Sequence, residues 1–158
     1  EHVVQALGAS AEDIQDKLAE LVEEVNRERR QIMALERELA QKEAESLLGR
    51  VEVVNGVPLL VARVSASSQP VLREMADLIR DKLKSAGIVL GTVHEDKPAF
   101  LAAVTQDLAA KGYHAGEIVK QVAKVAGGGG GAKASLAQAG GKYKDKLDEA
   151  LRMAKSLI

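Results

Sequence analysis

The residues of this 158-residue chain best suited to ligand chemistry are the glycines and the lysine of residues 127–141, which read GGGGGAKASLAQAGG. Because glycine carries no side chain, successive backbone N–H groups can point the same way and form a concave nest that attracts anions. Lys133 adds a positive charge within the stretch, and Lys124 and Lys142 stand near its two ends in the sequence. This combination predicts contact with the phosphates of a nucleic-acid backbone.

A flexible linker and a nucleotide-binding loop fit the glycine stretch less well. A linker would more often include Ser or Thr, and predicted elements flank this stretch closely. A Walker loop requires Lys between Gly and Ser or Thr, whereas Lys133 lies between Ala132 and Ala134. Gly127, Gly129 and Ala132 meet the dinucleotide-binding pattern formally. That motif must follow a strand and open a helix, however, and here it follows a predicted helix.

The distribution of charge favours an anionic partner for the C-terminal third. Residues 1–48 hold 12 acidic and 6 basic side chains, a net charge of −6. Residues 111–158 hold 4 acidic and 9 basic side chains, a net charge of +5. A solvated charged face would produce the same asymmetry without a partner, so the charges alone leave both interpretations open.

The few aromatic residues narrow the kind of nucleic acid. Phe100, Tyr113 and Tyr143 are the only ones. Sequence-specific reading of single strands relies on base stacking, so recognition of a folded nucleic-acid shape is favoured. For Tyr113 we favour packing in or at the edge of the core over stacking against a nucleic acid, whereas Tyr143 lies among lysines and fits packing or nucleic-acid contact equally well. The lack of cysteine excludes disulfides and favours a cytoplasmic protein, and no apolar run is long enough to span a membrane.

No other group of residues predicts catalysis or metal binding. His94, Glu95 and Asp96 are adjacent on a predicted strand, where neighbouring side chains point in alternating directions, so a turn cluster is favoured over a metal site. His114 lies between glycines and is expected in a turn, with phosphate contact as the alternative. No Ser/His/Asp set or carboxylate pair can be assembled, so we expect no catalytic residue, metal or cofactor.

A long helix is expected to precede the elements that position these residues. Ser10 and Asp13 resemble a helix start, and no Gly or Pro interrupts the pattern until Gly49. Apolar residues then follow in alternating steps of three and four, as in a coiled-coil seam. The seam that we expect to mediate dimerisation or packing comprises Leu18, Leu21, Val25, Ile32, Leu35 and Leu39. Its partner could be a second copy, another part of a longer chain or a preceding segment folded back.

From Gly49 the pattern changes to that of a small α+β domain. Two β-branched runs flank Asn55-Gly56 and predict a hairpin, and Pro58 places the start of the second strand at an edge. A helix is expected over residues 69–87, a second hairpin turning at residues 95–98, and helices over residues 114–126 and 144–158. The predicted division is therefore a helical subdomain at residues 1–48 and a globular subdomain at residues 49–158. We expect a mixed or antiparallel sheet packed by helices.

The stretch AGGGGGAKASLAQAGG resembles the glycine-rich signature of the DHHA1-type domain that closes alanyl-tRNA synthetases. The matching positions are Gly127, Gly128, Gly130, Gly131, Ala137, Gln138, Ala139, Gly140 and Gly141. Lys133 stands where Arg is usual, which keeps the charge but not the bidentate fork. The chain departs from the signature at Ala132, Ala134 and Ser135. Related DHH phosphoesterases are similar but carry a GGGH motif, and no histidine lies at this point of the chain.

The resemblance implies a tRNA-binding appendage of an alanine–tRNA ligase rather than a catalytic domain. In that family aminoacylation and zinc-dependent editing lie upstream, the globular part docks on the outer corner of tRNA, and the helical part can mediate dimerisation. The region would then bridge the aminoacylation and editing domains, with little discrimination among tRNAs. The residues expected to contact tRNA are Lys124, Gly127, Gly128, Gly129, Gly130, Gly131, Lys133, Gln138, Gly140, Gly141 and Lys142.

The alternative is a coiled-coil protein-interaction module that binds no nucleic acid. Salt dependence separates the two, because phosphate neutralisation makes affinity fall steeply as salt rises. If the chain is a tRNA-binding domain, Lys133→Ala weakens its binding to folded tRNA.

Overall fold

Packing divides the chain into two units. The structure is a computed structural model that describes residues 2, 10, 13–131 and 133–158. Its compact units are Glu1–Arg37 and Glu38–Ile158. The boundary expected between residues 48 and 49 followed the end of the long helix. The packing boundary lies earlier because Ala40, Ala44 and Leu47, on the last turns of that helix, are buried in the core of the globular unit.

The first unit contains most of the long helix α2 (Ile14–Leu47), as the apolar periodicity predicted. The helix begins at Ile14, later than a cap at Ser10 would place it, and the Ser10 hydroxyl donates to the Asp13 carboxylate at 2.6 Å. Among the seam residues of this unit, Leu18, Val25, Ile32 and Leu35 are 45–60% exposed, and Leu21 is partly buried. Leu39, in the second unit, is 67% exposed. Self-association through this seam stays a prediction.

The second unit is built on a mixed sheet, which confirms the α+β class. Its described residues form six strands in the order β1-β2-β3-β4-β6-β5. These are β1 (Glu52–Val54), β2 (Val57–Arg63), β3 (Gly87–His94), β4 (Lys97–Val104), β6 (Leu136–Gly140) and β5 (Gly129–Gly130). Strands β2 and β3 are parallel because helix α3 (Gln69–Lys82) crosses between them, and all other neighbours are antiparallel.

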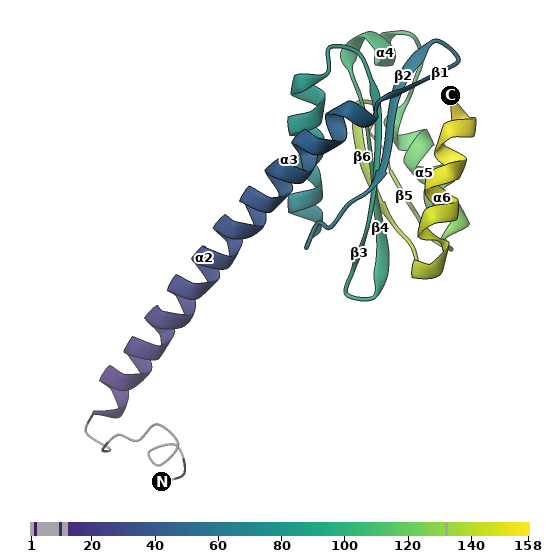
Figure 1. Ribbon diagram of the computed structural model, residues 1–158. Coiled ribbons are helices and arrows are strands. Elements are labelled where there is room, and N and C mark those ends of the chain that lie inside the picture. The colour runs from purple at the N-terminus through teal and green to yellow at the C-terminus, as the bar shows by residue number, and fades with distance from the viewer. Residues whose placement is uncertain (1, 3–9, 11–12, 132) are drawn as a thin grey trace. The chain divides into compact units, whose positions relative to one another are not determined.

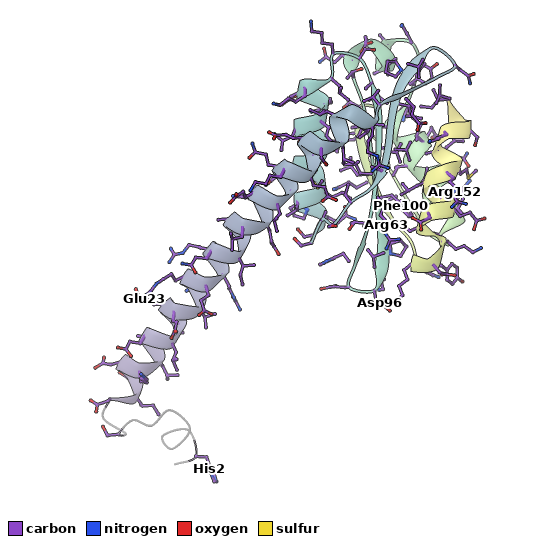
Figure 2. The ribbon with its side chains drawn as sticks, in the orientation of Figure 1. His2, Glu23, Arg63, Asp96, Phe100 and Arg152 are labelled. Atoms are coloured by element: carbon purple, nitrogen blue, oxygen red, sulfur yellow. The ribbon has the colours of Figure 1, made fainter. Side chains whose placement is uncertain are left out.

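Helices cover the two faces of the sheet (Figure 1). Helix α3 and the last turns of α2 pack on one face, where Leu72, Met75 and Ile79 of α3 meet Leu90 and Leu101 of the sheet. Helices α5 (Ala115–Val125) and α6 (Leu147–Ala154) pack on the other. That second core holds the single phenylalanine, Phe100, which is fully buried (Figure 2). It also holds the inward side chains of β6, Ala137 and Ala139.

The sequence predicted the positions of both hairpin turns, with a small error in the length of the second. Asn55 (φ +50°) and Gly56 (φ +81°) form the expected two-residue turn between β1 and β2. The second hairpin turns at Glu95 and Asp96, both with positive φ, so the expected turn over residues 95–98 was too long. Pro98 lies inside β4, opposite Val93.

Several elements differ from the expected series. Helix α3 ends at Lys82, and Gly87 opens β3 instead of stopping the helix. A short helix α4 (Gln106–Ala110) and the strands β5 and β6 were not expected. Single turns of 3₁₀ helix complete the unit at η1 (Leu48–Arg50), η2 (Lys144–Lys146) and η3 (Lys155–Leu157). In the part of the chain that the structure describes, no helix has the length and apolar character to cross a membrane.

Candidate nucleic-acid interface

The glycine stretch contains strands β5 and β6, which both pack against helix α5. At the start of α5, the N–H groups of Ala115 and Gly116 donate to the carbonyls of Ala134 (2.8 Å) and Lys133 (2.9 Å). These bonds satisfy two donors that a helix leaves open at its N-terminus. The stretch therefore holds the helix at its first turn, although the loop begins at the other end of the helix.

At the end of α5, the glycines close the helix. Gly127 (φ +70°) donates its N–H to the carbonyl of Lys124 at 3.1 Å, and Gly128 donates to that of Ala123 at 2.9 Å. This pair of bonds is a Schellman cap. The N–H groups of Gly127 and Gly128 are therefore not available to the expected anion-binding nest, and contact of these two residues with tRNA stays a prediction. Their N–H groups are already used, and they lie at the helix end that carries partial negative charge.

Several of these positions are glycine because neighbouring backbone lies too close to leave room for a side chain. A Cβ on Gly128 would lie 1.7 Å from the carbonyl oxygen of Gly140 and 2.5 Å from the Cα of Gly141. Gly131 has φ +83°, and a Cβ there would lie 2.7 Å from the carbonyl oxygen of Gly116. The fold itself thus requires glycine at both positions, with or without a ligand.

Gly129 is different, because nothing in the fold requires it to be glycine. In the part of the chain that the structure describes, a Cβ there would meet no atom within 4 Å, and its φ lies outside the left-handed region. It pairs with Gly140, where the nearest atom to a Cβ would be the carbonyl oxygen of Pro98 at 3.8 Å. Both residues are exposed, and β5 is the last strand of the sheet. We call this Gly129–Gly140 pair the bare glycine pair: a patch of backbone that no side chain covers.

The three lysines predicted to contact phosphate are all exposed but do not form one cluster. No described acidic residue forms an ion pair with Lys124, Lys133 or Lys142, whereas Lys146 pairs with Glu149 at 2.9 Å. Lys133 is tied to the first turn of α5 and Lys124 lies in the last. At 1.5 Å per residue the two backbones are about 12 Å apart along the helix.

Gln138 joins β6 to helix α3. Its Nε2 donates to the carbonyl oxygen of Gln69 at 3.2 Å, and the side chain is half-buried. Gln138 and Gly140 are two residues apart on β6, so they face the same side of the sheet, and Gly129 lies opposite Gly140. The bare glycine pair therefore lies on the α3 face of the sheet.

A groove between α3 and β6 adds residues that sequence reasoning missed. Its volume is about 480 Å³, and its walls include Arg73, Asp77 and Arg80 on one side and Lys133 and Gln138 on the other. The two arginines are seven positions apart on a helix, a spacing that places them on one face. That spacing was visible in the sequence, but nothing there placed α3 beside the glycine stretch.

The remaining candidates have structural surroundings. Tyr113 packs against the core, as expected. Tyr143 is 56% exposed, and its ring lies so close to Gly127 that a Cβ there would be 2.5 Å from it. His114 precedes α5, and its Nδ1 is buried without a hydrogen-bond partner in the described residues. His94 lies 3.8 Å from Glu95, and the described residues contain no group of His, Cys, Asp or Glu that could hold a metal ion.

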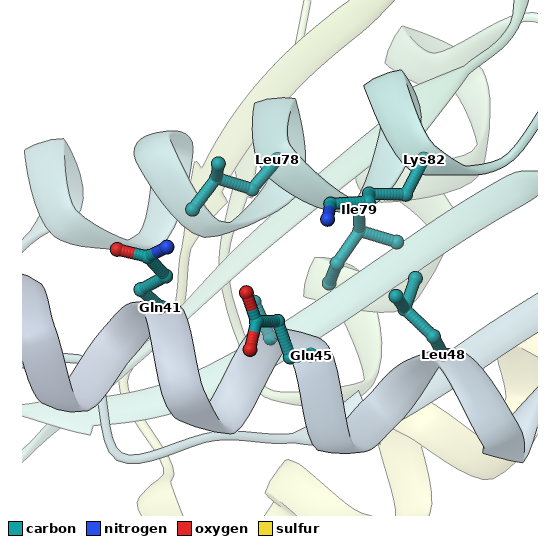
Figure 3. A pocket seen from close by; sticks show the side chains of 7 residues that line it. Gln41, Glu45, Leu48, Leu78, Ile79 and Lys82 are labelled. Atoms are coloured by element: carbon teal, nitrogen blue, oxygen red, sulfur yellow. The ribbon is translucent and has the colours of Figure 1, made fainter.

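A second cavity is too small for a ligand. It lies between the last turns of α2 and helix α3, with Gln41, Glu45, Leu78 and Lys82 among its lining residues (Figure 3). Its volume is about 30 Å³. This accommodates one or two water molecules, so the wider groove beside β6 is the better candidate for a ligand.

Residues 56–158 match the family model described as DHHA1 domain. The alanine–tRNA ligase of Dehalococcoides mccartyi (strain CBDB1) is 53% identical over 152 residues, which cover 96% of this chain and 18% of that protein. The alanine–tRNA ligase of Geobacillus kaustophilus (strain HTA426) is 44% identical over 151 residues, 96% of this chain and 17% of that protein. The chain thus spans less than a fifth of the curated relatives it matches.

Solved structures agree with this assignment. The C-Ala domain from Aquifex aeolicus alanyl-tRNA synthetase has a TM-score of 0.62 and 33% identity, covering 68% of this chain and 96% of that one. A structure titled as a DHH-domain member of the s1p family of ribosomal proteins, PF0399, has a TM-score of 0.51 and 18% identity, a likeness of fold alone. The chain belongs to the DHHA1 domain family, as a C-terminal domain of the alanyl-tRNA synthetases.

Proposed function

We propose that this chain is the tRNA-binding C-terminal segment of a longer alanine–tRNA ligase. In this proposal it docks on the outer corner of tRNA through the sheet edge that carries the bare glycine pair. The segment contributes binding and orientation, without a cofactor. Aminoacylation and editing belong to upstream domains of the longer, cytoplasmic enzyme. The segment bridges these two domains.

The observation that carries the proposal is the glycine at position 129. Close packing or positive φ requires Gly128 and Gly131, but Gly129 faces open space at a sheet edge. Glycine destabilises a strand, so a glycine that the fold does not need has a cause outside the fold. A ligand backbone that approaches closely supplies one, because any side chain at this position would block it.

Exposed lysine side chains also support tRNA binding by this part of the domain. The nearby Lys133 side chain extends into solvent with no described acidic partner, and so do those of Lys124 and Lys142. Lysine neutralises phosphate as a point charge and needs no fixed geometry. Such contacts favour tRNA without reading its sequence, so we expect little discrimination among tRNAs by this segment.

A second candidate function rests on the apolar stripe of helix α2. Leu18, Val25, Ile32 and Leu35 are about half exposed, and a helix with one exposed apolar stripe is stabilised by a partner. A homodimer or a protein-interaction module would cover it. This role is compatible with tRNA binding because the stripe and the bare glycine pair lie in different units.

The test is binding of the 158-residue chain to fluorescently labelled, folded tRNA, measured by anisotropy at several salt concentrations. Gly129→Leu should weaken binding at least about tenfold while leaving the fold intact, because its side chain points into open space. Gly49→Leu is the matched control: a Cβ at Gly49 also meets nothing within 4 Å, and Gly49 lies outside the glycine stretch. The proposal fails if the wild-type chain does not bind, or if Gly129→Leu binds like Gly49→Leu.

A further inference from the structure

We propose that the groove between α3 and β6 binds the phosphates of an RNA backbone, with Arg73 and Arg80 as the principal ligands and Lys133 opposite them. This inference rests on the proposed function and deepens it. It assigns the α3 face of the sheet as the face that meets RNA. The two arginines belong to an element that no glycine motif indicates.

The position of the arginines follows from the core. Leu72, Met75 and Ile79 turn one face of α3 into the sheet. This fixes the helix about its axis, so that Arg73 and Arg80 line the groove beside β6. Because one face of α3 is buried in the core, the helix that carries the two arginines is held rigidly. Binding groups on a rigid element lose less conformational entropy when a ligand binds.

The net charge of the groove favours an anion. Arg73, Arg80 and Lys133 supply three positive charges, and Asp77 supplies one negative charge. Arg80 Nη2 donates to Asp77 Oδ1 at 2.8 Å, and no described acidic residue forms an ion pair with Arg73. Asp77 thus orients one guanidinium and leaves the other to an external partner. Arginine has five N–H donors in a planar fork that matches a phosphate group.

The bare glycine pair lies beside the groove, on the same face of the sheet. Gln138 lines the groove, and Gly140 is the next residue on the same face of β6. Residues two apart on a strand are about 7 Å apart. An RNA strand bound by the arginines would therefore pass directly over the glycines, and the two features would act as one surface.

The neighbouring groove along α3 does not extend the site. It shares Arg80 and Ser135, and Lys84 adds a second positive charge. Asp81 and Asp107 cancel these two charges. The difference in net charge confines the proposed phosphate site to the Arg73 side, where the glycines lie.

The experiment uses the 158-residue chain, folded tRNA and the same anisotropy measurement. Arg73→Gln should weaken binding about five- to tenfold and reduce the salt slope by about 0.7–0.9, the loss of one phosphate contact. Asp77→Asn raises the positive charge of the groove and should tighten binding about two- to fivefold with a steeper slope. A gain in affinity cannot come from misfolding. Arg152→Gln, an exposed arginine on α6 across the sheet, is the matched control and should change affinity less than twofold.

The outcomes separate the two proposals. If the wild-type chain binds tRNA and Gly129→Leu weakens it, but Arg73→Gln and Asp77→Asn both bind like wild type, the groove proposal is overturned and the proposed function stands. If Arg73→Gln and Arg152→Gln lose affinity equally, the attraction is diffuse and the groove is not the site. If the wild-type chain does not bind tRNA, the proposed function fails, and the groove proposal with it.

Discussion

Replacing Gly128 by alanine should destabilise the globular unit far more than the same change at its neighbour Gly129. The new Cβ would lie 1.7 Å from the carbonyl oxygen of Gly140, whereas real Cβ contacts almost never fall under 3.0 Å. The obstructing atom is backbone, so it cannot rotate away. The β5 and β6 backbones must separate by more than an ångström, which breaks the Gly128–Ala123 bond that caps α5.

The expected cost is about 2–4 kcal/mol, from about 1–3 kcal/mol for overpacking and about 1 kcal/mol for the hydrogen bond lost. For a domain of this size that lowers the melting temperature by roughly 10–20 °C. Circular dichroism during heating measures it. Gly129→Ala should change stability by less than about 1 kcal/mol, because its Cβ meets open space. Equal melting temperatures for the two variants would refute the packing role assigned to Gly128.

Two further predictions concern the seam and the pH dependence. If the α2 stripe self-associates, sedimentation velocity should detect a dimer that Ile32→Glu converts to monomer. A wild-type chain that stays monomeric at every concentration would contradict self-association. Hydrogen bonds from Ser85 and then Thr105 lower the pKa of Asp107 below its ordinary value of 3.8. A lowered pKa stabilises the fold fully above pH 3.8 and loses that effect as pH falls through the folded-state pKa. Asp107→Asn should therefore melt below wild type at pH 6, and the difference should shrink as pH falls below 3.8; an unchanged gap would contradict the assignment.

Local sequence signals were sufficient for much of the fold. Asn55-Gly56 specifies its own hairpin because both residues accept positive φ. Helix α3 was predictable because Ser68 and Pro70 mark its start and its apolar residues repeat with helical spacing. Strands β5 and β6 were not predictable, because glycine and alanine have poor strand propensity. They form because Ala137 and Ala139 pack into the α5 core and β6 pairs with β4.

The candidate site, like the fold, could be predicted from the sequence only in part. The glycine stretch and Lys133 could be found from composition and resemblance, since they are contiguous in the chain. The use of the Gly127 and Gly128 N–H groups in a helix cap could not, because a run of glycines does not show which N–H groups remain open. Arg73 and Arg80 lie more than fifty residues before Lys133, and only the packing of α3 beside β6 brings them to the same groove.

The most direct measurement of the central claim is a ¹⁵N–¹H spectrum of the chain titrated with folded tRNA. The glycine amides serve as probes spread over the surface. We expect the largest shifts at Gly129 and Gly140, with little change at Gly56 and Gly112, which lie in the β1–β2 turn and after α4. Shifts centred on Gly56 and Gly112, or none at Gly129 and Gly140 at saturating tRNA, would contradict the claim that the sheet edge with the bare glycine pair is where tRNA docks.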